Sequence, residues 1–443
     1  MSSPWSRIAA APGEAPVPSP EEPHLSHGFK FVHAADLHLD APFAGVSADD
    51  ARVGAALAEA TYVAFERVID TCVEREALFL VLAGDAYNSA HTSLKAQLRF
   101  RAGMERLAAA GIEVFIVHGN HDPASGYSAR LDMPSTFHVF PSGRVERYEV
   151  KRDGALLAAV YGRSFETAAE SENFSLGYVR DDSDPLAVGV LHANIGGNPD
   201  YDSYAPASLD DLRAARMDYW ALGHIHKQER LSEDPWIVYA GSPQGLNPKE
   251  TGPHGCLVVD VSSGGAITVE HVETASVDWA QLECDVSGAR TIDEVVSLLG
   301  NTCDRLRDES DRPLVARITL TGRTDSHEDL VRSGSLPALV EDVRREQAAR
   351  DPWLWLDKAV DHSSASIDLE AIRSGADFAS ELVKLADEAA VNPETLFATV
   401  EDIAHPLRAK LQGYSPGMTP TEMLVAARDT ALDLLLAKGG DRA

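Results

Sequence analysis

The sequence predicts an α/β layered domain, followed by a small α+β domain and a helical C-terminal region. Three observations carry this prediction. Short apolar runs alternate with helix-spaced segments at the start of the chain, more short apolar runs continue to about residue 272, and a nearly all-helical pattern follows residue 361. Alternation of strand, helix and strand is typical of α/β domains. At 443 residues the chain is long enough for two or three domains.

The elements of the first domain follow from hydrophobic spacing. Runs of five to eight apolar residues have the length of buried strands, and apolar residues three or four apart indicate helices. Helices are expected over 49–76 and about 93–110. Strands are expected at 29–35, 78–83, 112–117, 186–193, 218–223, 236–241 and 256–261.

The chain is expected to divide into four parts. Residues 1–27, rich in Pro, Ala, Ser and Glu, read as a disordered tail. The α/β domain covers 28–272, and a small α+β domain with a strand at 314–322 covers 273–360. The helical region 361–443 is a candidate for partner docking.

The composition argues against a membrane-spanning or secreted protein and against a protein that coats DNA. No apolar run is long enough to cross a membrane, and the N-terminus does not resemble a secretory signal. Four widely spaced cysteines form no CxxC pair, which favours a reducing cytoplasm over a disulfide framework. A formal net charge of −30 argues against general DNA coating, so a phosphate must be attracted locally by metal ions or by a basic partner. A proteome with biased composition or adapted to salt would explain the charge equally well.

Five polar clusters fall at or just beyond the ends of predicted strands. Functional groups gather at the carboxyl ends of strands in open α/β sheets, so we expect these clusters to be neighbours in space. They are Asp36-Leu37-His38, Gly84-Asp85, Gly119-Asn120-His121-Asp122, His192 and Gly223-His224-Ile225-His226.

These residue types predict a metal centre with two ions. Imidazole and carboxylate ligands suit Mn, Fe or Zn better than Mg or Ca. Seven ligands exceed the needs of one ion that also binds water, and two ions that share a bridging carboxylate suit phosphoester hydrolysis. The predicted ligands are Asp36, His38, Asp85, Asn120, His192, His224 and His226.

Each cluster alone has an ordinary structural explanation. Asp85 could cap a helix, Asn120 could form a turn, and a lone His192 could be a satisfied core residue. Their joint occurrence after strands argues against coincidence. We interpret His33 and His118 as strand residues rather than ligands.

The ordered motifs D-x-H, GD, GNHD, a lone His and GHxH resemble the calcineurin-like metallophosphoesterase superfamily over residues 29 to 272. The stretches FKFVHAADLHLDAPF, AGIEVFIVHGNHDP, YAPASLDDLRAARMDYWALGHIHK and PWIVYAGSPQGLNPKETGPHGC are more similar to SbcD-type DNA repair nucleases, and most of all to their YhaO-type relatives. The resemblance implies a layered metallophosphoesterase sandwich, with β-sheets flanked by helices and a smaller capping domain.

The resemblance also implies roles for individual residues. Asp36, His38 and His226 would bind one ion, Asn120, His192 and His224 the other, and Asp85 would bridge them. His121 would be catalytic and assist departure of the leaving group or phosphate positioning. The family prefers Mn²⁺, hydrolyses DNA phosphodiesters, works beside a long coiled-coil ATPase and often forms homodimers.

One position departs from the pattern of related phosphatases. They carry an acidic residue three positions after the GD aspartate, which orients the catalytic histidine. Here Asn88 stands in that place. Asparagine can hydrogen-bond an imidazole but cannot stabilise an imidazolium by charge, so catalysis by His121 is expected to rest more on the metals.

Three functions remain open on the sequence alone. The first is a DNA exonuclease or endonuclease subunit, with local phosphate contacts from Arg163, Lys227, Arg230 and Lys249. The second is a small-molecule or cyclic-nucleotide phosphodiesterase that uses the same metal site. The third, a structural subunit with a vestigial site, is disfavoured by the complete ligand set.

Overall fold

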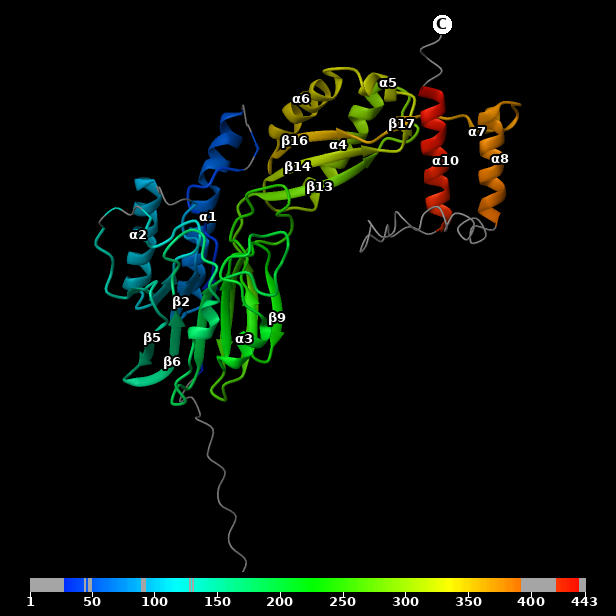
Figure 1. Ribbon diagram of the computed structural model, residues 1–443. Coiled ribbons are helices and arrows are strands. Elements are labelled where there is room, and N and C mark those ends of the chain that lie inside the picture. The colour runs from blue at the N-terminus through cyan, green and yellow to red at the C-terminus, as the bar shows by residue number, and fades with distance from the viewer. Residues whose placement is uncertain are drawn as a thin grey trace, which may run out of the picture. The chain divides into compact units, whose positions relative to one another are not determined.

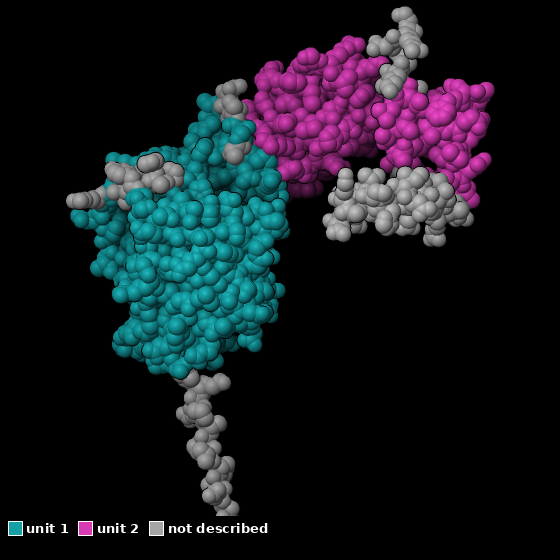
Figure 2. All heavy atoms as spheres, in the orientation of Figure 1, with its two compact units in different colours: residues 1–279 teal, residues 280–443 magenta. Residues whose placement is uncertain are grey.

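The computed structural model divides into two compact units, residues 1–279 and 280–443, which Figure 2 colours separately. The sequence had suggested a boundary at 272/273. The predicted tail 1–27 and parts of the predicted helical region, 392–419 and 438–443, lie outside the described residues. The structure describes residues 28–43, 45–46, 50–88, 93–126, 129, 131–391 and 420–437.

The first unit contains two six-stranded sheets (Figure 1). The first sheet has the order β12-β11-β1-β2-β3-β4, and the second has the order β5-β6-β7-β8-β10-β9. The strands of the first sheet are β1 (Phe29–Ala34), β2 (Phe79–Ala83), β3 (Glu113–Val117), β4 (Phe137–Val139), β11 (Gly255–Val261) and β12 (Ile267–Glu273). Those of the second are β5 (Glu146–Arg152), β6 (Ala155–Gly162), β7 (Ala187–His192), β8 (Tyr219–Gly223), β9 (Glu229–Glu233) and β10 (Trp236–Tyr239).

Helices cover the outer face of each sheet, so the unit has four layers. Helices α1 (Ala51–Glu74) and α2 (Leu94–Ala109) share a core with one face of the first sheet. The 3-10 helix η1 (Phe174–Gly177) and helix α3 (Leu209–Ala214) share another with the second sheet. A third core fills the space between the sheets. The expected α/β fold, with sheets flanked by helices, is confirmed.

Strand β1 shows why the central strands are apolar along their whole length. Successive side chains of a strand point to opposite faces. Phe31 therefore packs between the sheets, whereas Val32 packs toward the helices. His33 faces the second sheet, where its ring nitrogens lie 3.0 Å from the Tyr219 hydroxyl and 3.2 Å from the Leu222 carbonyl. This strand histidine thus joins the two sheets.

Strands β1 to β4 run parallel, as do β6, β7, β8 and β10. Their carboxyl ends therefore share an edge within each sheet. Strand β2 also packs across the sandwich against β7 and β8. This arrangement gathers the loops that follow β1, β2, β3, β7 and β8.

The second unit has a three-stranded sheet of order β13-β14-β16 and a small β15-β17 pair. Its core is formed by the sheet with helices α4, α5 and α6. Among the described helices of the chain, none combines the length and apolar character that crossing a membrane requires. The elements are β13 (Asp278–Asp285), α4 (Ile292–Asp308), β14 (Leu314–Thr321), β15 (Arg323–Thr324), α5 (His327–Leu330), α6 (Ser335–Ala348), β16 (Leu354–Asp361), β17 (Ser364–Ala365), α7 (Leu369–Arg373), α8 (Phe378–Val391) and α10 (Pro420–Ala437).

Candidate metal centre

The loops at the shared strand edge bring the predicted residues together. Asp36 and His38 follow β1, Asp85 follows β2, Asn120 and His121 follow β3, His192 ends β7, and His224 and His226 follow β8. Among the described residues there are three groups of side chains, and within each group the possible ligand atoms all lie within 4.8 Å of one another. They are Asp36 with His38 and His226, His38 with Asp85 and His121, and Asp36 with Asp85 and His192.

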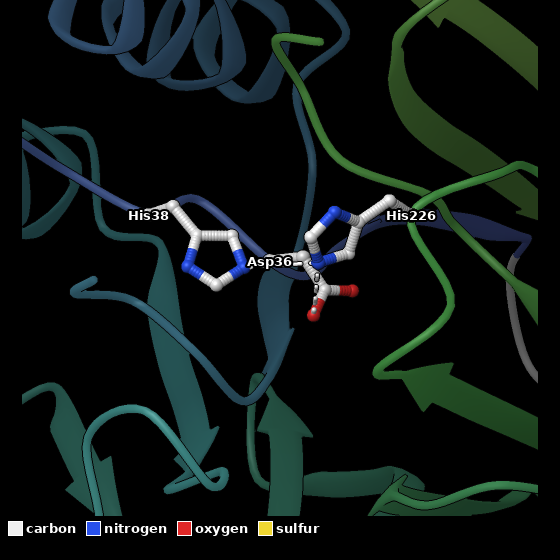
Figure 3. Close-up of side chains that lie close together, drawn as sticks. All are labelled: Asp36, His38 and His226. Carbon is white, nitrogen blue, oxygen red and sulfur yellow. Dashed lines mark hydrogen bonds and ion pairs between the residues drawn. The ribbon is translucent and has the colours of Figure 1, made fainter. Parts of the chain in front are cut away.

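The first group is shown in Figure 3. The Nε2 atoms of His38 and His226 lie 3.0 Å apart, and Asp36 Oδ1 lies 4.0 Å from His226 Nε2. Metal–nitrogen bonds are about 2.0–2.1 Å long. Two ligands at a right angle around an ion are then about 3 Å apart, which matches the spacing of these ring nitrogens.

A second set of ligand atoms, the His192 set, consists of His192, Asp85 and Asn120 and overlaps the third of these groups. The Nδ1–H of His192 donates to the Ala83 carbonyl at 2.9 Å, which leaves Nε2 with a lone pair. That nitrogen faces Asn120 Oδ1 at 2.9 Å and Asp85 Oδ2 at 3.4 Å. Three electron-rich atoms that converge repel one another unless a cation lies between them, so the geometry fits a metal ion.

Asp85 belongs to the His192 set and also lies close to His38 of the first group. Its Oδ2 is 3.8 Å from His38 Nε2 and 3.4 Å from His192 Nε2, while its Oδ1 accepts the backbone N–H of His121 at 2.9 Å. The carboxylate is therefore close to ligands of the first group and of the His192 set. This is the position that a bridging ligand would occupy.

His224 has a different set of contacts from the other predicted ligands. Its backbone N–H donates to both oxygens of Asp36, at 3.1 and 3.0 Å. Its Nε2–H donates to the Asp202 carbonyl at 2.9 Å, and its ring lies 5.2 Å from that of His192. Nδ1 is thus the nitrogen left to bind an ion, although His224 belongs to none of the three close groups among the described residues.

Glycines make the close approach of these loops possible. A Cβ on Gly119 would lie 2.3 Å from Asp85 Oδ1 and 2.9 Å from His192 Cε1. A Cβ on Gly84, whose φ is +92°, would lie 2.4 Å from His192 Nδ1. The glycines of the GD and GNHD motifs therefore leave room for ligands of neighbouring loops.

Burial disfavours the charged form of the Asp36 and Asp85 carboxylates. Asp36 and Asp85 are fully buried, and this desolvation raises their pKa values to about 6 and about 7. Burial lowers the pKa of His192, and it lowers that of His224 to about 3, so both imidazoles are neutral at pH 7. Neutral imidazoles and buried acids are the groups that a divalent cation would stabilise as ligands.

His226 differs from its neighbours because it has an acidic partner. Burial opposes its protonation, but the hydrogen bond to Glu250 and the nearby Asp36 carboxylate raise its pKa to about 9. Its Nδ1–H donates to Glu250 Oε1 at 2.8 Å. An ion that binds Nε2 must therefore compete with a proton.

His121 lies at the mouth of the centre with its side chain exposed to solvent. Its Nδ1–H donates to the backbone carbonyl of Asn88 at 2.9 Å. The sequence suggested that the Asn88 side chain could bond this imidazole, whereas in the structure the Asn88 backbone carbonyl does so. Because a carbonyl at this position is supplied by any residue, the missing acid matters less for orienting His121 than the motif suggested.

A pocket of about 300 Å³ opens onto the centre. It is lined by Asp85, Asn120, His121, His224 and His226, and by the segment 199–204, which contributes two tyrosines and two aspartates. The sequence interpretation missed this segment and also Glu250. Glu250 and Tyr204 lie in stretches that carry the family resemblance, but nothing in the residue types there indicated a place at the centre, which depends on the paths of long loops.

The four basic residues predicted near the site differ in their contacts. Arg163 donates to Glu172 and to the Ser142 carbonyl, and Arg230 pairs with Glu233. Lys227 and Lys249 are exposed and adjoin the hydrogen-bonded pair of His226 and Glu250 in sequence. The two arginines are held by acidic partners, whereas the two lysines are exposed.

Comparisons with known proteins show which family this chain resembles. Residues 29–228 match the calcineurin-like phosphoesterase family, and residues 279–364 match the middle domain of metallophosphoesterase YhaO. The uncharacterized metallophosphoesterase YhaO of Bacillus subtilis is 35% identical over 326 residues, which cover 73% of this chain and 79% of that protein.

More distant relatives are described as DNA double-strand break repair protein Mre11. The protein of Methanopyrus kandleri is 25% identical over 293 residues, covering 60% of this chain and 61% of that protein. The protein of Thermoplasma acidophilum is 25% identical over 276 residues, which cover 57% of this chain and 69% of that protein.

Proposed function

The chain belongs to the calcineurin-like phosphoesterase family, and on that premise we propose that it is a metal-dependent nuclease subunit that hydrolyses DNA phosphodiester bonds in DNA repair. The observation that carries the proposal is the position of Asp85 between two groups of buried ligand atoms. Asp36, His38 and His226 would hold one ion, Asn120, His192 and His224 the other, and Asp85 would bridge them.

The donor set combines imidazole, carboxylate and amide oxygen without a thiolate and so suits Mn, Fe or Zn. Among these we propose Mn²⁺, which the family resemblance implies. Divalent ions at such a centre activate a water molecule and provide charge for the phosphate oxygens. His121 donates Nδ1–H to Asn88, which leaves Nε2 at the pocket to hold or release a proton. It would protonate the leaving oxygen or position the phosphate.

DNA is the substrate that the names of the Mre11 relatives favour. Lys227 and Lys249 would contact the phosphate backbone beside the centre. With a net charge of −30 the chain is poorly suited to bind DNA alone at long range. We therefore propose a basic or ATP-driven partner, namely a long coiled-coil ATPase.

The helical C-terminal region is our candidate for docking that partner. Helix α8 exposes Phe378, Leu385 and Val391, with 71%, 61% and 86% of their surfaces accessible. Helix α10 packs against α8 and exposes Leu434. Apolar side chains of this size on one helical pair suit a helical partner. A homodimer and a cytoplasmic location are further proposals from the resemblance and the four free, buried cysteines.

Metal-dependent cleavage of DNA tests the proposed function. Labelled linear duplex and single-stranded DNA are incubated with the chain and Mn²⁺, with and without a candidate ATPase, beside a chromogenic phosphodiester. We expect DNA cleavage that EDTA abolishes. Asp85→Asn should lower the rate by at least about 100-fold, the scale of losing one preorganised electrostatic group.

A small-molecule or cyclic-nucleotide phosphodiesterase is the second candidate, and the small size of the pocket, about 300 Å³, favours it. Hydrolysis of the chromogenic or cyclic substrate without DNA cleavage, even with the ATPase present, would reject the nuclease proposal in favour of this one. DNA cleavage that survives Asp85→Asn would instead reject the assigned metal centre.

A further inference from the structure

The loop between β10 and β11 reaches the metal centre through Glu250. Ser242 at its start donates its backbone N–H to the His226 carbonyl at 2.9 Å. Later in the same loop, Glu250 Oε1 accepts Nδ1–H of His226 at 2.8 Å. The Glu250 side chain is 9% exposed, although its neighbours Lys249 and Thr251 are both exposed.

The loop fixes both oxygens of this carboxylate. Oε2 accepts the backbone N–H of Leu246 at 2.6 Å, and Oε1 also accepts the side-chain amide of Asn247. The Glu250 carbonyl accepts Nε2–H of His254 at 3.2 Å. A glutamate held by neighbours on both oxygens is not free to turn into solvent, so it presents a fixed acceptor to His226.

The same loop is tied to the core of its unit. Gln244 is buried, and its amide donates to the Val277 carbonyl at 2.6 Å while its Oε1 accepts the backbone N–H of Ser276 at 2.8 Å. Thr274 Oγ1 donates to the Pro243 carbonyl at 2.9 Å. The position of Glu250 is therefore set by buried contacts rather than by a surface loop alone.

The hydrogen bond decides which nitrogen of His226 can face an ion. With hydrogen on Nδ1, the lone pair is on Nε2, which lies 3.0 Å from His38 Nε2 and 4.0 Å from Asp36 Oδ1. Without Glu250 the ring could rotate, or carry its hydrogen on Nε2 and direct that hydrogen at the ligand group. An acceptor behind a ligand histidine typically fixes the tautomer, the ring orientation and the basicity.

We propose that Glu250 is a positioning residue for the ion site formed by Asp36, His38 and His226. It acts through His226 and itself touches neither substrate nor ion. The proposal rests on the assignment of this group as a metal site within the proposed function, but it requires no particular substrate. Loss of such outer partners typically weakens metal affinity about 10- to 100-fold.

Metal binding by the full chain tests this role without reference to activity. Mn²⁺ titrations followed by calorimetry, and by the electron paramagnetic resonance signal of free Mn²⁺, give the number of ions and their affinities. We expect two ions on the wild type. Glu250→Ala should weaken one of them by about 10- to 100-fold. Glu250→Gln retains an acceptor but no charge, so its loss should be smaller.

A matched control separates positioning from loop stability. Glu233→Gln removes a surface partner of Arg230 in the same unit and should bind both ions as the wild type does. A purely structural role would lower the thermal midpoint of the metal-free protein and leave both Mn²⁺ affinities unchanged. The proposal would be overturned if Glu250→Gln lowered the thermal midpoint and left both Mn²⁺ affinities unchanged. It would also be overturned if both Glu250 variants bound Mn²⁺ as the wild type does. Failure of DNA cleavage with normal Mn²⁺ binding would count against the proposed function alone.

Discussion

The backbone at the metal ligands adopts conformations that most residues avoid. Asp36, His38 and Asp85 have φ values of 51°, 43° and 52°, and His224 has a φ of 97°. Positive φ values are energetically unfavourable for residues other than glycine, and they persist only where surrounding contacts stabilise them. Here the contacts include Asp36 N–H to the Gly84 carbonyl and His38 N–H to the Asp85 carbonyl, both at 3.0 Å. These backbone conformations and hydrogen bonds bring the ligands of the two loops close together.

His121 is the residue on which the catalytic assignment is most directly tested. His121→Ala should lower the turnover number by about 10²–10⁴, the usual contribution of general acid–base catalysis. Mn²⁺ binding should persist, because Asp85 accepts the backbone N–H of His121 and that bond survives the substitution. Steady-state kinetics and Mn²⁺ titration measure the two effects separately.

Asn88 supplies the control for that experiment. Its backbone carbonyl, which binds the His121 ring, remains in Asn88→Ala. We expect this variant to retain a turnover number within about threefold of the wild type, consistent with a substitution that removes no catalytic contact. A loss as large as that of His121→Ala would show that the Asn88 side chain takes part after all.

At the scale of elements, the close approach of three strand ends makes the GNHD glycine indispensable. In Gly119→Ala the new methyl group would lie 2.3 Å from Asp85 Oδ1, which is closer than any van der Waals contact allows. Asp85 or the loop after β3 must then move, and either change disturbs ligands of both groups. We expect a loss of at least one Mn²⁺ site and about 1–3 kcal/mol of stability, the usual cost of overpacking.

Calorimetric Mn²⁺ titration together with denaturant unfolding checks this prediction. Gly111→Ala is a useful comparison, because its φ is also left-handed at +74° but a Cβ there meets no atom within 4 Å. That variant should lose some stability through backbone strain and keep both ions. Normal Mn²⁺ binding by Gly119→Ala would show that the loops can separate without losing the centre.

The sequence predicted the central strands of both sheets better than their edges. Strands such as β2 are buried on both faces and form continuous apolar runs. The strands that escaped prediction include β4, β5 and β9, which lie at sheet edges. Strand β5 reads ERYEVKR, and charged residues are common on edge strands because they discourage aggregation. Strand β6 was also missed, although its apolar sequence offered a signal.

The same distinction applies to the site. The predicted ligands could be placed because each follows a buried strand, and parallel strand ends must meet. Glu250 and Tyr201 could not, because they lie in loops whose paths are fixed by contacts such as those of Gln244 with residues 276 and 277. The hydrogen-bond partner of His121 could not be predicted either, because it is a backbone carbonyl, which every residue type has.

At the scale of the whole molecule, the charge of the chain gives the metals a role beyond catalysis. The net charge is −30, and the centre buries two of the chain's carboxylates, for which His226, with its raised pKa, is the nearby group that can carry positive charge. Burial of anions is costly unless they are paired or bind a cation. Bound divalent ions would remove this cost, so metal binding and folding stability should be linked.

The pH dependence of that linkage can be predicted from the shifted groups. The pKa values of Asp36 and Asp85 are raised from 3.8 to about 6 and about 7, and that of His226 is raised from 6.5 to about 9. A raised pKa means that the metal-free folded state holds protons that the unfolded state has released. The stability that these three groups contribute is therefore lost as pH rises from about 4 toward 9. His192 and His224, whose pKa values are lowered, have the opposite effect and contribute stability that is gained as pH rises toward 6.5. The ions bind the deprotonated groups, so their affinity increases over the same range.

Saturating Mn²⁺ should accordingly raise the thermal midpoint more at about pH 8.5 than at about pH 6, relative to EDTA at each pH. Differential scanning calorimetry of the full chain measures both midpoints. Asp85→Asn removes the carboxylate closest to both ligand groups and should shrink the Mn²⁺ shift at both pH values. An equal shift at the two pH values for the wild type would mean that ions displace no protons from these groups. The ions would then bind elsewhere, because a centre built from these buried acids and His226 must release protons to hold a cation.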